Sequence, residues 1–131
     1  SRIMLALKTV FADSDDIGTL IFDEIDTGIS GKTAAKVGEK LYRIARNRQV
    51  FCISHLPQIA VMADQHLFLS KSTDGLTTRT NIKVLDREGR IGEIARLMGG
   101  SRISEGILSS AREMTAEADL FKKTCHTSLQ P

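Results

Sequence analysis

Apolar and polar residues alternate in blocks along the first half of the chain. Residues 19–23 and 50–53 are short apolar runs, which are typical of strands buried on both faces, as in a parallel sheet. Between them, apolar residues from Ala34 to Ala45 follow helical spacing. We therefore predict a strand, a helix and a second strand. Because such crossovers connect parallel strands, both strands should end at the same edge of the sheet.

The second half of the chain has a different pattern. Residues 66–70 are typical of a strand, a turn follows at Asp74-Gly75, and the alternation over residues 78–84 indicates a half-exposed strand. We expect these strands to form an antiparallel hairpin at the edge of the sheet. Helical spacing predicts further helices over residues 2–13, 57–64, 91–98 and 107–121. Gly99-Gly100 should end the third of these helices.

Composition sets limits on the class of protein. The 131 residues are 41% hydrophobic and 26% charged, which is ordinary for a globular domain or a piece of one. With 18 basic and 16 acidic residues the net charge is +2, too balanced to indicate nucleic-acid or membrane binding by charge alone. No window approaches the roughly 18 apolar residues of a membrane span. Cys52 and Cys125 lack zinc-type spacing, so we expect reduced thiols.

Carboxylates and an imidazole follow the two predicted parallel strands. Asp23 and Glu24 end the first strand, Asp26 lies two positions further on, and His55 follows the second strand. Ligands bind at this edge of open α/β sheets. Asp23 is suited to Mg²⁺, Glu24 to a water nucleophile, and His55 to a terminal phosphate. The arrangement therefore predicts phosphoryl chemistry.

Each signal alone has a plainer interpretation. An acidic pair at a strand end is often the start of a solvated loop, and a histidine after a strand is usually a turn residue. His66 and His126 have no comparable context, and we assign them no chemistry. Gly31-Lys32-Thr33 opens a helix as a phosphate-binding loop does, but Asp26 occupies the place of that motif's first glycine. The conjunction of acids and imidazole in one unit favours function.

These residues resemble a known family. Residues 19–24 (TLIFDE) resemble the Walker B strand of ABC-type ATPases, and residues 53–60 (ISHLPQIA) resemble the switch-histidine loop of the SMC and RecN branch. The loop 26–31 (DTGISG) and residues 94–100 (IARLMGG) are most similar to the RecN group, whose members act in bacterial DNA double-strand-break repair. The resemblance covers residues 1–122, and residues 123–131 look like a flexible tail.

The resemblance implies an α/β fold, the carboxy-terminal half of a P-loop NTPase-like ABC/SMC head. This fold has a parallel sheet with flanking helices and an antiparallel edge hairpin. Two such heads sandwich ATP. By similarity, Asp23 helps to hold Mg²⁺ through water, Glu24 is the catalytic carboxylate, and His55 is catalytic and contacts the γ-phosphate. All three would bind nucleotide. The D-loop at the interface between heads would contain Asp26, Thr27, Gly28 and Ser30.

The resemblance also places parts of the machinery upstream. The Walker A loop and the signature motif are absent here, so we expect a fragment that binds ATP weakly and does not hydrolyse it alone. Expected partners are a second head as a homodimer, the missing amino-terminal part of the same protein, and DNA through the complete protein. Expected localisation is cytoplasmic, with the nucleoid, and no membrane is involved.

Two rival interpretations belong to other classes. The first is a metal-dependent enzyme acting on nucleic-acid phosphates, in which Asp23, Glu24 and Asp26 together ligate Mg²⁺. The second is a non-catalytic interaction module that docks through the hairpin and the last helix. In the second case, Glu24→Gln and His55→Ala would leave function intact.

Overall fold

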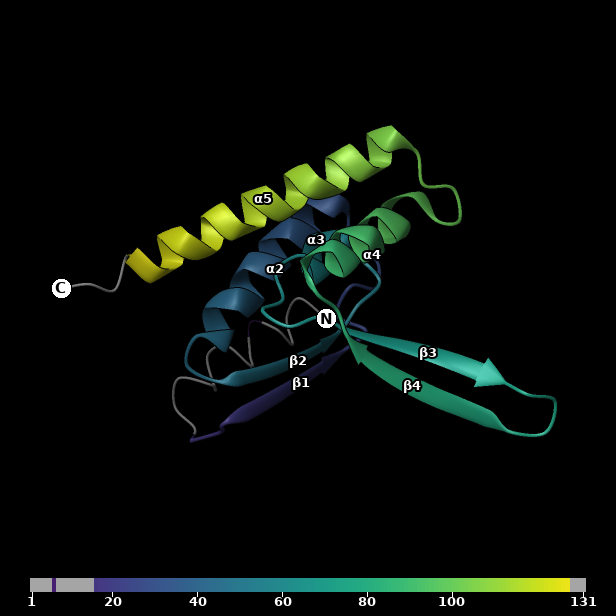
Figure 1. The fold of residues 1–131 in the computed structure, drawn as a ribbon. Coiled ribbons are helices and arrows are strands. Elements are labelled where there is room, and N and C mark those ends of the chain that lie inside the picture. Colours follow the sequence, from purple (N-terminus) through teal and green to yellow (C-terminus); the bar gives the residue numbers. More distant parts are fainter. Residues whose placement is uncertain (1–5, 7–15, 128–131) are drawn as a thin grey trace.

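The computed structural model describes Ala6 and residues 16–127 (Figure 1). The elements in chain order are β1 (Thr19–Asp23), α2 (Gly31–Ala45), β2 (Gln49–Ile53), α3 (Pro57–Ala60), β3 (Leu67–Thr73), β4 (Thr78–Val84), α4 (Arg87–Gly99) and α5 (Glu105–Thr127). The predicted mixed α/β order is confirmed within these residues. The helix predicted over residues 2–13 lies outside them, apart from Ala6. Helix α3 ends at Ala60, earlier than the predicted residue 64.

The parallel pairing of β1 with β2 is confirmed, in a register that sets Asp23 beside Ile53. Because side chains alternate along a strand, one face of the pair points towards α2. Its core residue Phe22 is 2% exposed. The side chains that pack between the strands and the helix include Leu20, Phe22, Val50 and Cys52 from the strands and Ala34, Val37 and Leu41 from α2.

The opposite face of this pair is apolar but exposed. Ile21 and Ile53 are each 62% exposed, and Phe51 is 44% exposed. The continuous apolar runs predicted burial on both faces, and within the described residues α2 buries one face of each strand. An apolar run shows that both faces of a strand are suited to burial. It does not show whether the described residues include a segment that packs on each face.

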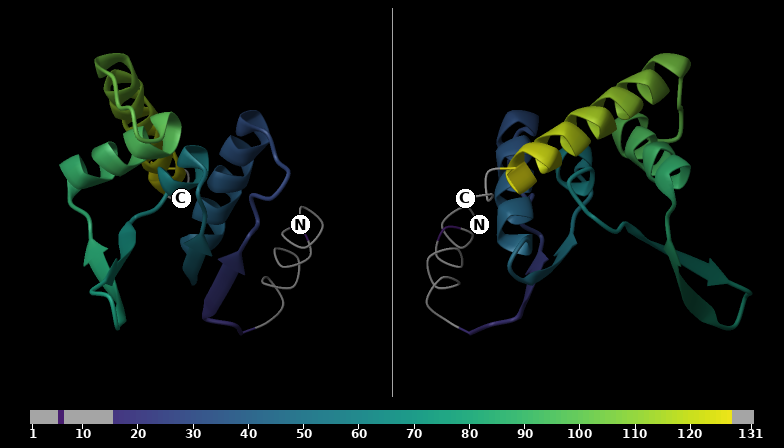
Figure 2. Two further views of the ribbon diagram at one scale, coloured as in Figure 1. Left: turned by 90° about the vertical axis from the view of Figure 1, so that its right-hand side faces the viewer. Right: turned by 60° about the vertical axis from the view of Figure 1, so that its left-hand side comes forward.

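Strands β3 and β4 form the predicted antiparallel hairpin, from the Leu67–Val84 pair to the Thr73–Thr78 pair. Among the described residues the hairpin is a sheet of its own and is not hydrogen-bonded to the edge of β1–β2. It extends away from the helices in both views of Figure 2. Strand β4 is exposed along its whole length, whereas its alternation predicted one buried face. The alternation therefore predicted the strand correctly, but it did not predict which residues pack against it.

A second core lies where α3, α4 and α5 meet α2. Ile94 of α4 is 1% exposed at its centre, with Val61, Met62, Ala95, Ala111 and Ala118 among its neighbours. A β-carbon on Gly38 of α2 would lie 2.8 Å from the Gln58 carbonyl oxygen, so glycine allows α3 to pack directly on α2. Gly100 ends α4 with a φ of 66°, a conformation that favours glycine, as the Gly99-Gly100 pair predicted.

The last helix is longer than predicted and corrects the expected tail. Helix α5 continues to Thr127, so residues 123–127 are helical, and residues 128–131 lie outside the described residues. The end of the helix is held by tertiary contacts that sequence spacing does not report. His126 Nε2 lies 3.0 Å from the Tyr42 hydroxyl, and the Cys125 carbonyl accepts a hydrogen bond from Arg46. Both partners belong to the region around the end of α2.

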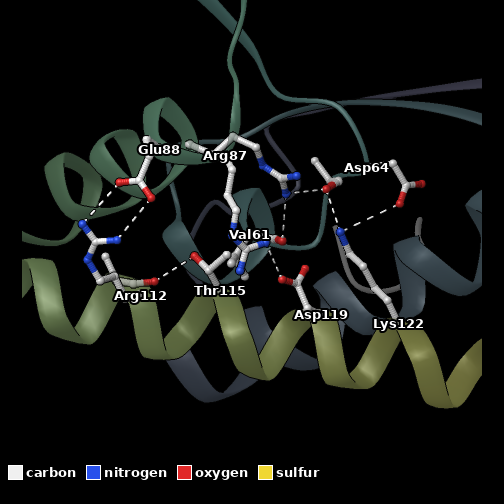
Figure 3. Close-up of polar contacts among 11 residues, drawn as sticks. Val61, Asp64, Arg87, Glu88, Arg112, Thr115, Asp119 and Lys122 are labelled. Carbon is white, nitrogen blue, oxygen red and sulfur yellow. Dashed lines mark hydrogen bonds and ion pairs between the residues drawn. The ribbon is translucent and has the colours of Figure 1, made fainter.

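Charged side chains fasten α5 to α4 and to the segment after α3 (Figure 3). Arg112 faces Glu88 with two contacts of 3.3 Å, and Arg87 lies 2.9 Å from Asp119. Deeper in, Arg90 and Lys122 both donate to the carbonyl of Ala63, at 2.6 and 2.7 Å. Exposed ion pairs add little stability, so the buried apolar residues beneath this network contribute most of it.

We expect Ile94→Ala to lower the free energy of unfolding by about 2–5 kcal/mol, because it removes methyl groups from a filled core. Leu76→Ala is the matched control, since Leu76 is 97% exposed and its truncation should change stability by less than about 0.5 kcal/mol. Urea unfolding followed by circular dichroism measures both changes. Equal effects of the two substitutions would contradict the assignment of Ile94 to the core.

Candidate functional site

The carboxyl ends of β1 and β2 bring two loops side by side. Because the strands are parallel and Asp23 pairs with Ile53, residues 24–30 and residues 54–56 begin at the same edge. The sequence prediction that the acids and His55 follow one sheet edge is therefore confirmed by the pairing. The contact that joins the loops is between Asp26 and residues 54–55, which are separated from it by 28 and 29 positions.

Asp26 is the buried centre of this edge, at 5% exposure. Its Oδ2 accepts hydrogen bonds from Ser54 Oγ at 2.7 Å and from the His55 backbone N–H at 3.1 Å. The same oxygen lies 3.2 Å from Nδ1 of the His55 ring. Ser54 Oγ in turn accepts the backbone N–H of Leu56 at 3.1 Å. A buried carboxylate with several donors is well satisfied, which its loss of hydration requires.

The surroundings of Asp26 favour its ionised form. Burial by itself would raise the pKa of this carboxyl, but hydrogen bonds from Ser54 and the His55 backbone, helped by the imidazole, hold it below its ordinary 3.8. Asp26 is therefore a carboxylate at neutral pH. Ser54 was not among the predicted site residues. A hydroxyl beside a candidate histidine was the only available signal, and it is too common in loops to be specific.

Glu24 has an unusual backbone conformation, with a φ of 55°. This left-handed region is uncommon for residues with a β-carbon, and such strain is concentrated at functional sites. Thr27 stabilises the turn, because its hydroxyl donates to the Glu24 carbonyl at 3.1 Å. Gly28, with a φ of 73°, continues the turn without strain. The loop is thus ordered by its own bonds while Glu24 stays exposed.

The remaining predicted residues of this loop lie at the surface. Thr27, Gly28 and Ser30 are exposed. Asp26 differs from them, because its side chain points inward to Ser54 and His55. Ser30 occupies the N-cap position of α2, but its side chain makes no capping hydrogen bond.

Asp23 is suited to be one of the ligands of Mg²⁺. It ends β1 and is exposed, and a carboxylate oxygen is the kind of ligand that Mg²⁺ prefers. Within the described ranges, no three His, Cys, Asp or Glu side chains gather as a metal-ligand group. One carboxylate with water and substrate phosphates is a common way to hold Mg²⁺, so Asp23 could be the protein ligand of such a site.

Cys52 does not contribute a nucleophile to this edge. Burial, together with the charges of Asp26 and Asp23, raises the pKa of its thiol to about 11. At neutral pH it is an uncharged thiol packed between β2 and α2. Cys52 is a free cysteine, as the sequence predicts, and it packs as a small hydrophobic residue.

Comparison with curated proteins gives consistent matches. The chain is 40% identical to the DNA repair protein RecN of Bacillus subtilis over 124 residues, which cover 95% of this chain and 22% of that protein. It is 46% identical to RecN of Vibrio cholerae over 118 residues, which cover 90% of this chain and 21% of that protein. The chain is homologous to RecN. It spans about a fifth of the length of these RecN proteins, in their carboxy-terminal part.

A RecN of Streptomyces coelicolor is 45% identical over 121 residues, covering 91% of this chain and 21% of that protein. No family model matches the chain. A solved structure from work on "ATP-driven dimerization and DNA stimulated activation of SMC ATPases" aligns with a TM-score of 0.59 and 18% identity. The alignment covers 74% of this chain and 59% of that chain, and it shows a shared fold.

A search of the described helices found none that combines the length and the apolar character needed to cross a lipid bilayer.

We expect Asp26→Asn to destabilise the chain by about 1–3 kcal/mol at neutral pH, because two hydrogen-bond donors and the His55 ring then face an amide in place of a carboxylate. The folded-state pKa of Asp26 lies below its unfolded value, so its ionisation stabilises the fold above pH 3.8. That contribution is lost as pH falls through the folded pKa. The stability difference between parent and variant should therefore shrink below pH 3.8.

Urea unfolding at neutral pH and at about pH 3 measures this difference. Asp74→Asn, at an exposed turn position, is the matched control and should change stability by less than about 0.5 kcal/mol. A penalty for Asp26→Asn that is the same at both pH values would contradict the role given to the ionised carboxylate.

Proposed function

We propose that the chain is the carboxy-terminal lobe of a RecN-like ATPase head, which hydrolyses ATP between two engaged heads during DNA double-strand-break repair and recombination. The observation that carries this proposal is the meeting of Asp23, Glu24 and Asp26 with His55 at one edge of a parallel pair. The RecN matches and the shared fold with an SMC ATPase support the same assignment.

Each residue has a role that its position supports. Asp23 holds Mg²⁺ through water, and the ion supplies charge to offset that of the phosphates. Glu24, exposed at the start of the loop, orients or deprotonates the attacking water. His55, whose side chain is 80% exposed, contacts the γ-phosphate and stabilises charge that develops there.

Residues 26–30 are proposed to lie along the interface with the second head of a homodimer. The exposure of Thr27, Gly28 and Ser30 supports a surface role for this loop. Asp26 takes part through the backbone it anchors, because its side chain is engaged within its own chain. In this proposal DNA is contacted by the complete protein, which acts in the cytoplasm with the nucleoid.

Of the two rival functions, the metal-dependent nuclease has the less support. It requires Asp23, Glu24 and Asp26 to share one metal ion, but the Asp26 carboxylate is turned to Ser54 and His55. The described residues contain no group of metal ligands of the required size. The Glu24→Gln substitution distinguishes the interaction-module hypothesis from the ATPase hypothesis, because only an ATPase should lose activity.

In the complete protein, Glu24→Gln should lower the rate of ATP hydrolysis by about 100-fold or more while ATP binding is retained, because it removes the base and keeps the shape. Glu39→Gln is the matched control on α2, where Glu39 forms an ion pair with its helix neighbour Lys36 at 3.3 Å. Phosphate release measures the rate, and the isolated chain should show none. An unchanged rate in Glu24→Gln would overturn the proposed catalytic role.

The missing amino-terminal part of the protein is the proposed partner of the exposed face formed by Ile21, Phe51 and Ile53. An apolar sheet face of this kind is seldom left to water. We expect Ile21→Thr to change the stability of the isolated chain by less than about 0.5 kcal/mol, since the side chain is 62% exposed. In the complete protein the same change should cost about 1–3 kcal/mol, as for a buried residue.

Urea unfolding of the isolated chain and of the complete protein, each with and without Ile21→Thr, gives the comparison. A penalty that is equally small in both would show that the face stays uncovered in the complete protein.

A further inference from the structure

An exposed imidazole is anchored on a buried carboxylate at the candidate site. The His55 side chain is 80% exposed, whereas that of Asp26 is 3% exposed. Exposed side chains normally change rotamer within nanoseconds. Here Nδ1 lies 3.2 Å from Asp26 Oδ2, so one side of the ring is tied to a group that packing holds still. Among the described residues the other ring nitrogen, Nε2, has no hydrogen-bond partner, so it is available to an external one.

Ser54 bonds to the same oxygen of Asp26. Its hydroxyl donates to Asp26 Oδ2 at 2.7 Å and accepts the Leu56 N–H at 3.1 Å. Because a hydroxyl has one proton and two lone pairs, both bonds can form at once. The backbone on either side of His55 is therefore bonded, directly or through Ser54, to one carboxylate. This arrangement fixes the loop as well as the ring.

The closeness of the Asp26 carboxylate to Nδ1 determines the tautomer of the His55 ring. A carboxylate oxygen 3.2 Å from Nδ1 would repel a lone pair on that nitrogen and attract a hydrogen, so the hydrogen of a neutral His55 belongs on Nδ1. We infer that Asp26 and Ser54 are positioning residues that hold His55 in the Nδ1–H tautomer and present Nε2 to the nucleotide phosphates. The reference to phosphates rests on the proposed function. The tautomer itself rests on the contacts within this chain, which differ from the interface role that resemblance implies for Asp26.

Nitrogen chemical shifts of the ring test the tautomer directly. In long-range ¹H–¹⁵N correlation spectra of the ¹⁵N-labelled 131-residue chain at about pH 8, where an ordinary imidazole is neutral, His55 should show the pattern of the Nδ1–H form. A parent chain in which His55 shows the Nε2–H form would overturn the inference. No nucleotide is present, so this outcome is independent of the proposed ATPase activity, which Glu24→Gln tests.

Three variants assign the effect to the named residues. Asp26→Ala should convert His55 to mainly the Nε2–H form, and Ser54→Ala should shift part of the population in the same direction. Ser70→Ala on the exposed strand β3 is the matched control and should keep the parent pattern. Backbone amide spectra show whether each variant is folded. If Asp26→Ala is not folded, Ser54→Ala alone tests the positioning role. Folded variants that keep the parent pattern would overturn the positioning role.

A kinetic measurement in the complete protein tests the link to catalysis. Ser54→Ala should lower kcat by about 10-fold or more while KM changes less, because a misplaced ring affects the transition state more than ground-state binding. A shifted tautomer with unchanged kcat would overturn the statement that the pair presents Nε2 to the phosphates.

Discussion

The parallel pairing of β1 with β2 is the constraint on which the candidate site depends. It places the loops that follow Asp23 and Ile53 at one edge, although the residues that meet there are 29 positions apart in the chain. The pairing is stabilised by the apolar layer under α2, where Phe22 is 2% exposed. Burial on one face of the strands thus determines the chemistry that is possible at their ends.

Burying the charge of Asp26 between two loops costs free energy, because the carboxylate loses its hydration. This cost explains why polar groups surround it. Asp26 loses hydration, so it requires the hydroxyl of Ser54, a backbone N–H and an imidazole nitrogen as partners. Removing any one of them leaves a buried charge less satisfied. The same requirement makes the position of His55 specific, because the ring must reach the carboxylate that the fold has already buried.

The described residues form two cores, one enclosed by helices and the other covered on one side only. The core around Ile94 is closed by α2, α3, α4 and α5, and polar contacts join α5 to α4 and to the segment after α3 (Figure 3). The layer between α2 and the parallel strands is closed on one side, and Ile21 and Ile53 remain exposed on the other. This uncovered apolar face is where the proposed packing of further chain would take place.

The sequence by itself determined the order of elements, the ends of the parallel strands and the residues that follow them. These features depend on local apolar spacing and on turn residues, which act over a few positions. Local spacing could not show that the hairpin forms a separate sheet, that α5 extends to Thr127, or that Asp26 is buried against Ser54. Those outcomes depend on contacts between residues far apart in the chain, and only the tertiary structure brings such residues together.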